Sequence, residues 1–283
     1  MVVNSSVRHL PAYCIPLTDV SLTFETSCHL QLPSVFDRLF FDCQLDYLTA
    51  LGKIVKVLAY PYFVSNLYFL VLWIFFFFFR GNRKEQLVWS LAGIVIGPVS
   101  QIIFTRDWWK PALVCPSCWV HIEDIILGFT LCGISGVIYN DLFVNKQTPE
   151  RLRKITFIQI VFFLTVIVAA LDLAFIPHLI WCVRSFWTST ISAMLIALVI
   201  ALSRPDLIKS MFVSGFLLMI LAAPFYLIGL NLNSRWIQEE WLWRNLLGVY
   251  VFKIPLEEWL WFFVIGFSFS AFWELVARVR YRR

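Results

Sequence analysis

Two pairs of adjacent acidic residues open strongly apolar segments of the chain. Glu123 and Asp124 stand at the start of one apolar run, and Glu257 and Glu258, just after Pro255, stand at the start of another. Carboxyl groups next to apolar surface are suited to general acid–base chemistry and mark function in membrane segments. The structural alternative is that proline and acids favour the first turn of a helix, where they satisfy free N–H groups and the helix dipole.

Helical geometry restricts what each acid pair can do. Neighbouring residues of a helix point about 100° apart. One acid of a pair therefore aims at a given spot, and the other binds, orients or caps.

Three further polar residues are predicted near the acids. Asp172 lies near the end of the run 155–175, and it either faces the same side or pairs with Arg184. Gln101 is a candidate polar partner, although hydrogen bonding between helices is the commoner role of a glutamine in a span. His121 is one turn from Asp124, where it either pairs with an acid or is solvated.

Tryptophans surround both acid pairs. Trp259 and Trp261 lie inside the last apolar run, and we expect them to form the wall of a substrate cavity. Five others are expected to form a belt at the membrane interface: Trp108, Trp109, Trp236, Trp241 and Trp243.

Composition indicates that lipid is the solvent of this chain. Its 283 residues are 60% hydrophobic and 14% charged, with a mean hydropathy of +0.78. A soluble domain of this length needs more polar surface. The net charge of +5 is modest and no basic cluster has a nucleic-acid-binding context, so we expect no nucleic-acid partner.

The apolar runs predict an all-α integral membrane protein with about seven transmembrane helices. Each run is near the roughly 20 residues that a spanning helix needs. They are Ala59–Phe79, Leu87–Phe104, Val120–Tyr139, Ile155–Phe175, Phe186–Leu202, Met211–Leu230 and Pro255–Val276. Residues 1–50 are predicted to be a poorly structured extension without a cleaved signal peptide, ending in an interfacial helix at about 36–57.

Positive charge predicts the orientation in a cell membrane. Basic residues concentrate in the loops after the first, third and fifth runs and at the C-terminus: Arg80, Arg83, Lys84, Lys146, Arg151, Arg153, Lys154, Arg204, Lys209, Arg278, Arg280, Arg282 and Arg283. Fewer lie in the loops on the other side. The positive-inside rule places the C-terminus in the cytoplasm and the N-terminus outside, which brings both acid pairs to the outer face.

The acid pairs also indicate an internal repeat. Glu123 and Glu257 are 134 positions apart, and Pro98 and Pro224 precede them in corresponding runs, each followed by a Trp-rich loop. The membrane domain, residues 51–283, is therefore predicted to hold two parallel three-helix repeats, about 58–139 and 185–279, joined by a connecting helix at about 155–178. Chance similarity in so biased a composition is the alternative.

The remaining motifs do not predict a cofactor. The seven cysteines show no readable disulfide set, and Cys115 and Cys118 with His121 do not assemble four zinc ligands. No Gly-rich nucleotide motif follows a strand. Because none of the lysines lies within a predicted span, a retinal Schiff base is excluded.

Pro255, Glu257 and Glu258, between a Trp-rich loop and an aromatic last run, resemble the P-x-E-E/D motif of the lycopene cyclase domain. This is the small membrane type found as heterodimeric bacterial cyclases and as tandem domains fused to phytoene synthase in fungi. The likeness covers roughly residues 58–279 and includes the duplicated three-span plan. It is partial at Glu123 and Asp124, where His121 replaces the expected proline.

The resemblance implies a redox-neutral cyclisation of a linear carotenoid end group without a cofactor. Glu257 or Glu123 would protonate the terminal double bond, and Glu258, Asp124 or Asp172 would assist. The hydrophobic carotenoid or isoprenoid substrate would enter from the bilayer, and a homo- or hetero-oligomer is possible. Two alternatives stay open: a carotenoid or isoprenoid hydratase, in which water traps the cation, and a non-enzymatic membrane carrier or structural subunit.

Overall fold

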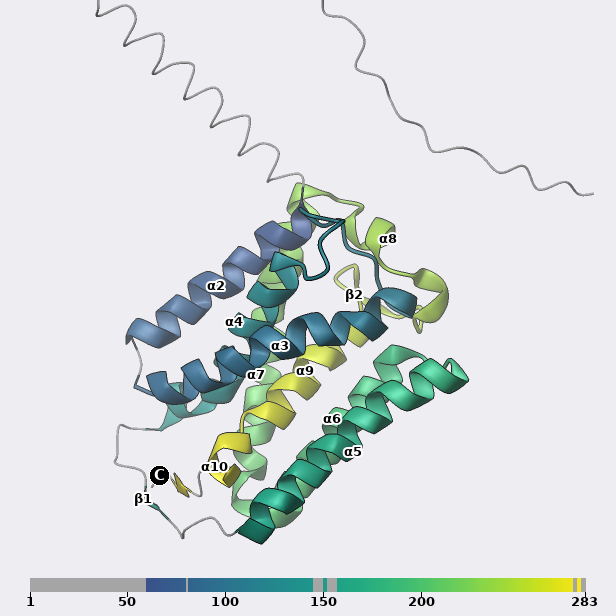
Figure 1. Cartoon of the computed structure of the whole chain (residues 1–283). Coiled ribbons are helices and arrows are strands. Elements are labelled where there is room, and N and C mark those ends of the chain that lie inside the picture. Colours follow the sequence, from purple (N-terminus) through teal and green to yellow (C-terminus); the bar gives the residue numbers. More distant parts are fainter. Residues whose placement is uncertain (1–59, 80, 145–149, 152–156, 277–278, 281–283) are drawn as a thin grey trace, which may run out of the picture. The chain divides into compact units, whose positions relative to one another are not determined.

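The computed structural model describes residues 60–79, 81–144, 150–151, 157–276 and 279–280 (Figure 1). The predicted extension 1–50 and the interfacial helix at 36–57 lie outside these residues. Six helices of 19 to 25 residues dominate: α2 (Pro61–Phe79), α3 (Arg83–Asp107), α4 (Ile122–Phe143), α5 (Phe157–Trp181), α6 (Ser185–Ser203) and α7 (Ile208–Leu232). Shorter helical elements follow or interrupt them: η1 (Pro205–Leu207), α8 (Trp236–Glu240), η2 (Trp243–Asn245), α9 (Leu256–Phe269) and α10 (Phe272–Val276).

Five helices of the described chain have the length and apolar composition to cross a bilayer. They are Pro61–Phe79, Arg83–Asp107, Ile122–Phe143, Ser185–Ser203 and Pro205–Leu232. The other two predicted spans correspond to α5, whose part Ala169–Trp181 is apolar, and to α9. The prediction of an all-α membrane protein is confirmed.

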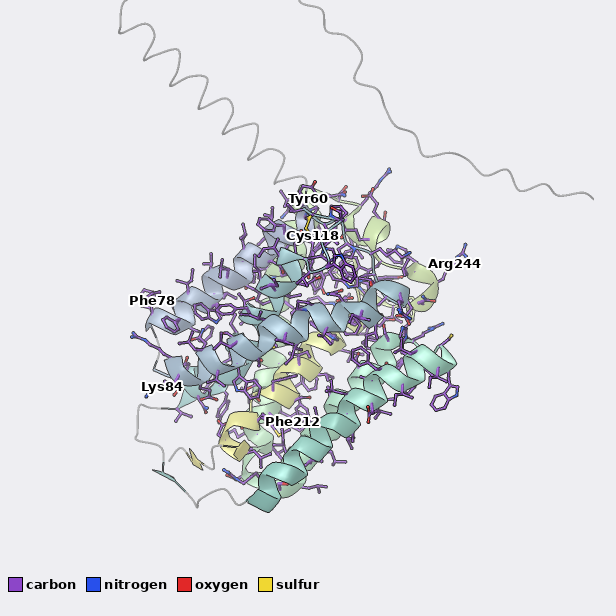
Figure 2. All side chains as sticks on the ribbon, in the orientation of Figure 1. Tyr60, Phe78, Lys84, Cys118, Phe212 and Arg244 are labelled. Carbon is purple, nitrogen blue, oxygen red and sulfur yellow. A yellow bond between two sulfur atoms is a disulfide. The ribbon has the colours of Figure 1, made fainter. Side chains whose placement is uncertain are left out.

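The outer faces of the long helices are apolar. Val71 of α2 is 64% exposed, Leu91 of α3 is 60% exposed and Ile220 of α7 is 61% exposed. Phe78, at the end of α2, is also exposed (Figure 2). Apolar side chains at this density on the outside of long helices suit contact with lipid tails, which accept them without the cost that water imposes.

Two predicted spans differ from the observed helices. The short run Leu87–Phe104 belongs to the longer α3, which continues through Pro98 for 25 residues. The predicted continuous span Pro255–Val276 is wrong, because α9 ends at Phe269 and α10 begins at Phe272. The apolar pattern alone cannot show this break, since apolar residues lie on both sides of it.

Most helix contacts are made by a few neighbouring helices. Helix α3 packs along α4, α7 packs along α9, α5 packs along α6, and α2 contacts both α4 and α7 (Figure 1). The α3–α4 crossing is close because glycines meet there: a Cβ on Gly93 would lie 2.0 Å from the carbonyl oxygen of Gly128. Small residues allow such an approach in membrane helices, where packing contributes most of the association.

Short strands connect the helix ends. Strands β2 (Tyr250–Val251) and β3 (Ile254–Pro255) form an antiparallel hairpin that leads directly into α9. Its two turn residues, Phe252 and Lys253, have φ of 54° and 67°, as a two-residue turn of this hand requires. Strands β1 (Glu150–Arg151) and β4 (Val279–Arg280) pair antiparallel at the C-terminal end of the chain.

Candidate active site

Both acid pairs occupy the first turn of a helix and are buried. Glu123 and Asp124 of α4 are 0% and 2% exposed, and Glu257 and Glu258 of α9 are 2% and 6% exposed. First-turn carboxyls on a helix surface normally reach water, so simple capping does not require this burial. The sequence had left the environment of the acids open.

The first acid of each pair is held by a preceding loop. The Oε1 atom of Glu123 accepts a 2.6 Å hydrogen bond from the backbone N–H of Val114, and Oε1 of Glu257 accepts one from the backbone N–H of Leu247. The Oε2 atom of each carboxyl is buried and has no hydrogen-bond partner among the described residues. A buried carboxyl oxygen without a hydrogen-bond donor carries a desolvation cost.

The second acid of each pair accepts a hydrogen bond from a buried tyrosine. The hydroxyl of Tyr62 in α2 donates to Oδ1 of Asp124 over 2.9 Å, and the hydroxyl of Tyr226 in α7 donates to Oε2 of Glu258. The indole N–H of Trp241 donates to the other oxygen of Glu258 over 2.5 Å. The two acids of a pair thus have different surroundings.

Aromatic rings connect the two acid pairs. Trp109 and Trp241 form an antiparallel bridge between the loops after α3 and α8, and the backbone N–H of Lys110 donates to the carbonyl of Glu240 over 2.6 Å. The ring centroids of Trp109 and Trp241 are 5.3 Å apart, and Tyr62 meets Trp109 edge-on at 4.6 Å. A continuous set of contacts therefore joins the second acids of both pairs.

Glu240 anchors these loops to each other. Its carboxyl accepts hydrogen bonds from the indole of Trp236 at 2.8 Å and from the backbone of Ala112. Burial raises the pKa of Glu240 to about 7, against the opposing effect of these hydrogen bonds.

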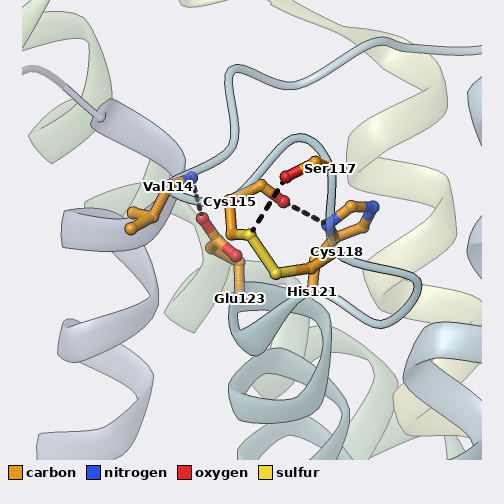
Figure 3. The surroundings of a disulfide bond; sticks show 6 residues. All are labelled: Val114, Cys115, Ser117, Cys118, His121 and Glu123. Carbon is orange, nitrogen blue, oxygen red and sulfur yellow. Dashed lines mark hydrogen bonds between the residues drawn. A yellow bond between two sulfur atoms is a disulfide. The ribbon is translucent and has the colours of Figure 1, made fainter.

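A disulfide joins Cys115 to Cys118 in the loop before α4 (Figure 3). The sequence had shown no readable pairing, and the structure corrects that interpretation. His121 accompanies the disulfide, with Nδ1 3.2 Å from the carbonyl oxygen of Cys115, rather than hydrogen bonding to an acid. Figure 3 also shows the neighbouring bond from Val114 to Glu123, so the disulfide loop is the loop that holds the first acid.

No three or more His, Cys, Asp or Glu side chains of the described residues are grouped as metal ligands. The disulfide occupies the sulfur atoms of both Cys115 and Cys118.

One comparison with known protein families matches the part of the chain that contains the second acid pair. Residues 184–276 match the family model described as lycopene cyclase. This part of the chain is similar to the lycopene cyclase family. Comparisons with curated proteins and with solved structures found no significant match.

The matched residues include α6, α7 and α9, and with them Tyr226, Trp241, Glu257 and Glu258. The first acid pair lies outside the matched residues. The loops that carry Trp109 and Trp241 connect it to the second pair, and α4 also contacts α7 and α9.

The remaining predicted site residues differ in what they contact. Gln101 accepts the indole N–H of Trp109 over 3.1 Å, and Trp261 packs edge-on against Trp108 at 6.1 Å. Trp259 donates instead to the carbonyl of Val251 over 3.3 Å.

Asp172 is exposed on α5. Within the described residues no salt bridge joins it to Arg184. The structure does not bring its carboxyl into hydrogen-bonding contact with the acid pairs.

The predicted tryptophan belt is wrong for four of its five members. The side chains of Trp108, Trp109, Trp236 and Trp241 are at most 8% exposed and belong to the main hydrophobic core. Loops that fold back over the helix ends cover these tryptophans. The hydrophobic periodicity of the sequence cannot predict this burial.

Tyr62 and Tyr226 are residues of the candidate site that sequence reasoning missed. Each stands within an apolar run, two or fewer positions after a proline, Pro61 and Pro224. A buried tyrosine hydroxyl requires a partner, and this requirement was the available signal.

Proposed function

We propose that the chain catalyses the redox-neutral, acid-catalysed cyclisation of a linear carotenoid end group. A carboxylic acid O–H adds its proton to the terminal C=C bond. A nearby C=C bond attacks the resulting carbocation and closes a six-membered ring. A carboxylate then removes a proton from a ring carbon, so the product has the elemental composition of the substrate.

One observation carries this proposal: the division of hydrogen bonding within both acid pairs. Glu123 and Glu257 each keep a buried oxygen without a hydrogen-bond partner among the described residues, so this oxygen is free to meet a bound end group. Asp124 and Glu258 are each held by a tyrosine hydroxyl, which suits a carboxyl group that steadies the cation or takes the final proton. We assign the acid role to Glu257 or Glu123 and the assisting roles to their neighbours.

The aromatic rings beside the acids fit a cationic intermediate. Trp241 contacts Glu258, and Trp261 lies among Phe104, Trp108 and Phe262. Aromatic faces attract cations by roughly 0.5–2 kcal/mol, more as water is excluded. A hydrophobic polyene delivered from the bilayer is the class of substrate that such surroundings favour.

We also propose that the membrane domain consists of two parallel three-helix repeats with the acid ends on the outer face. Helix lengths support the repeat, since α2 and α6 have 19 residues each and α3 and α7 have 25 each. The basic residues at the opposite end support the orientation.

Expression in lycopene-accumulating bacteria tests the activity. The expected result is a cyclised pigment of unchanged mass, lost by about 10²–10⁴-fold in Glu257→Gln or Glu123→Gln, as for removal of a general acid. Glu239→Gln, which changes an exposed acid of α8, is the matched control. A product heavier by one water would indicate a hydratase, and absence of any product with the protein present in the membrane would refute catalysis on this substrate.

A further inference from the structure

The tyrosines that meet the second acids are not equivalent positions of the proposed repeat. Tyr62 is the second residue of α2, and the second residue of α6 is Phe186. Tyr226 is the nineteenth residue of α7, and the nineteenth residue of α3 is Gln101. Duplication of one ancestral tyrosine therefore does not account for both hydroxyls.

Both tyrosines nevertheless come from one helix pair. Helix α2 packs against α7, and each helix sends a buried hydroxyl to an acid on a different helix, α4 or α9. Tyr62 is 0% exposed and Tyr226 is 2% exposed. Asp124 and Glu258 thus each accept a tyrosine hydroxyl hydrogen from the α2–α7 helix pair, although the two tyrosines are not equivalent positions of the proposed repeat.

The opposite helix pair supplies no such hydroxyl at the matching positions. Gln101 of α3 accepts the indole of Trp109, and Phe186 of α6 packs against Trp108 with ring centroids 5.2 Å apart. The matching positions of α3 and α6 thus hold an amide and an aromatic ring, and neither supplies a hydroxyl to the acids.

We infer that Tyr62 and Tyr226 are positioning residues that hold the Asp124 and Glu258 carboxyls across a helix contact for the ring-closing reaction. This inference rests on the proposed function. A first-turn carboxyl left alone turns back to its own helix N–H groups. The tyrosine O–H directs it away from them, toward the rings that join the two acid pairs.

The two tyrosines differ in importance because their acids differ in donors. Glu258 also receives the indole N–H of Trp241, so it retains one donor when Tyr226 is lost. Asp124 has Tyr62 as its one side-chain donor among the described residues, since the indole of Trp109 is directed to Gln101. Tyr62→Phe should therefore cost more than Tyr226→Phe.

Steady-state kinetics on isolated membranes with lycopene, normalised to the amount of protein, tests the inference. Removing a hydrogen bond to a charged group should lower kcat by about 10- to 100-fold in Tyr62→Phe and by about tenfold or less in Tyr226→Phe, with KM nearly unchanged. Tyr68→Phe, elsewhere on α2, is the matched control and should keep the wild-type kcat.

A double-mutant cycle separates positioning from simple packing. The Tyr62→Phe change should cost little once Asp124→Asn is present, because the hydroxyl then has no carboxylate to hold. Equal losses in both backgrounds, or full kcat in both phenylalanine variants, would overturn the inference while leaving the wild-type cyclase activity in place. A wild-type protein without cyclised product would overturn the proposed function itself and this inference with it.

A second variant keeps the inference testable if Tyr62→Phe fails to fold. If Tyr62→Phe does not accumulate in membranes, fluorotyrosine at position 62 keeps the ring and the hydroxyl but makes the hydroxyl a stronger donor. Its kcat should differ from that of the wild type, and an unchanged kcat would count against positioning.

Discussion

The side-chain amide of Asn140 donates a 2.5 Å hydrogen bond to the carboxyl of Glu274, and these residues are 134 positions apart, as are Glu123 and Glu257. Two equivalent positions of a pair of parallel repeats touch only where the axis that relates them passes. The Trp109–Trp241 bridge lies at the acid end of the same helices. We therefore expect the axis of the proposed repeat to run from the Asn140–Glu274 contact to the Trp109–Trp241 bridge.

The Asn140–Glu274 bond should stabilise the end of the bundle away from the acids. Glu274→Leu leaves the buried Asn140 amide without its acceptor and should lower the free energy of unfolding by about 1–3 kcal/mol. Glu274→Gln keeps an acceptor oxygen and should lower it less. Thermal unfolding in detergent compares the variants, and equal losses would show that the hydrogen bond contributes little.

The Cys115–Cys118 disulfide should support the first acid pair. Replacing both cysteines by serine loosens the loop whose Val114 N–H binds Glu123, and the cyclase rate should fall roughly twofold to tenfold, the worth of one neutral hydrogen bond. Normal product formation by the double variant would contradict this role.

Thiol labelling tests the disulfide without activity. A variant with serine at the other cysteines should react with a maleimide only after reduction. Labelling of intact cells from outside after reduction by an impermeant phosphine would support the orientation proposed here, because disulfides persist in oxidising compartments.

Stability should depend on pH through Glu240. Its pKa is raised by burial from 4.5 to about 7, so between these values the folded protein holds a proton that the unfolded chain has lost. The contribution of Glu240 to the free energy of unfolding therefore falls as the pH rises from about 4.5 to 7 and is constant outside that window. The difference between wild type and Glu240→Gln should change across this window, whereas a flat difference would argue against the raised pKa.

Close packing of α3 on α4 should depend on Gly93. A methyl group there would lie 2.0 Å from the Gly128 carbonyl oxygen, so Gly93→Ala should separate the helices and destabilise the fold by about 1–3 kcal/mol or more. Val95→Ala changes a 63% exposed position of the same helix and should have a smaller effect. Similar unfolding temperatures for both variants would refute the close contact.

The sequence by itself determined the membrane environment, the approximate spans and the two acid pairs. Each of these follows from local composition: an apolar run long enough to cross a bilayer must be helical, because lipid offers no partner to backbone N–H and C=O groups. The acids were conspicuous because charged residues are rare within membrane segments.

Only the tertiary structure decided which residues surround those acids. The Tyr62–Asp124 and Tyr226–Glu258 bonds, the bridge between Trp109 and its partner, and the burial of the tryptophans all join segments far apart in the chain. A helix pattern specifies which residues share a face, but not which helix that face meets. Partner choice depends on how loops fold back and how closely helices approach, and these are properties of the assembled bundle.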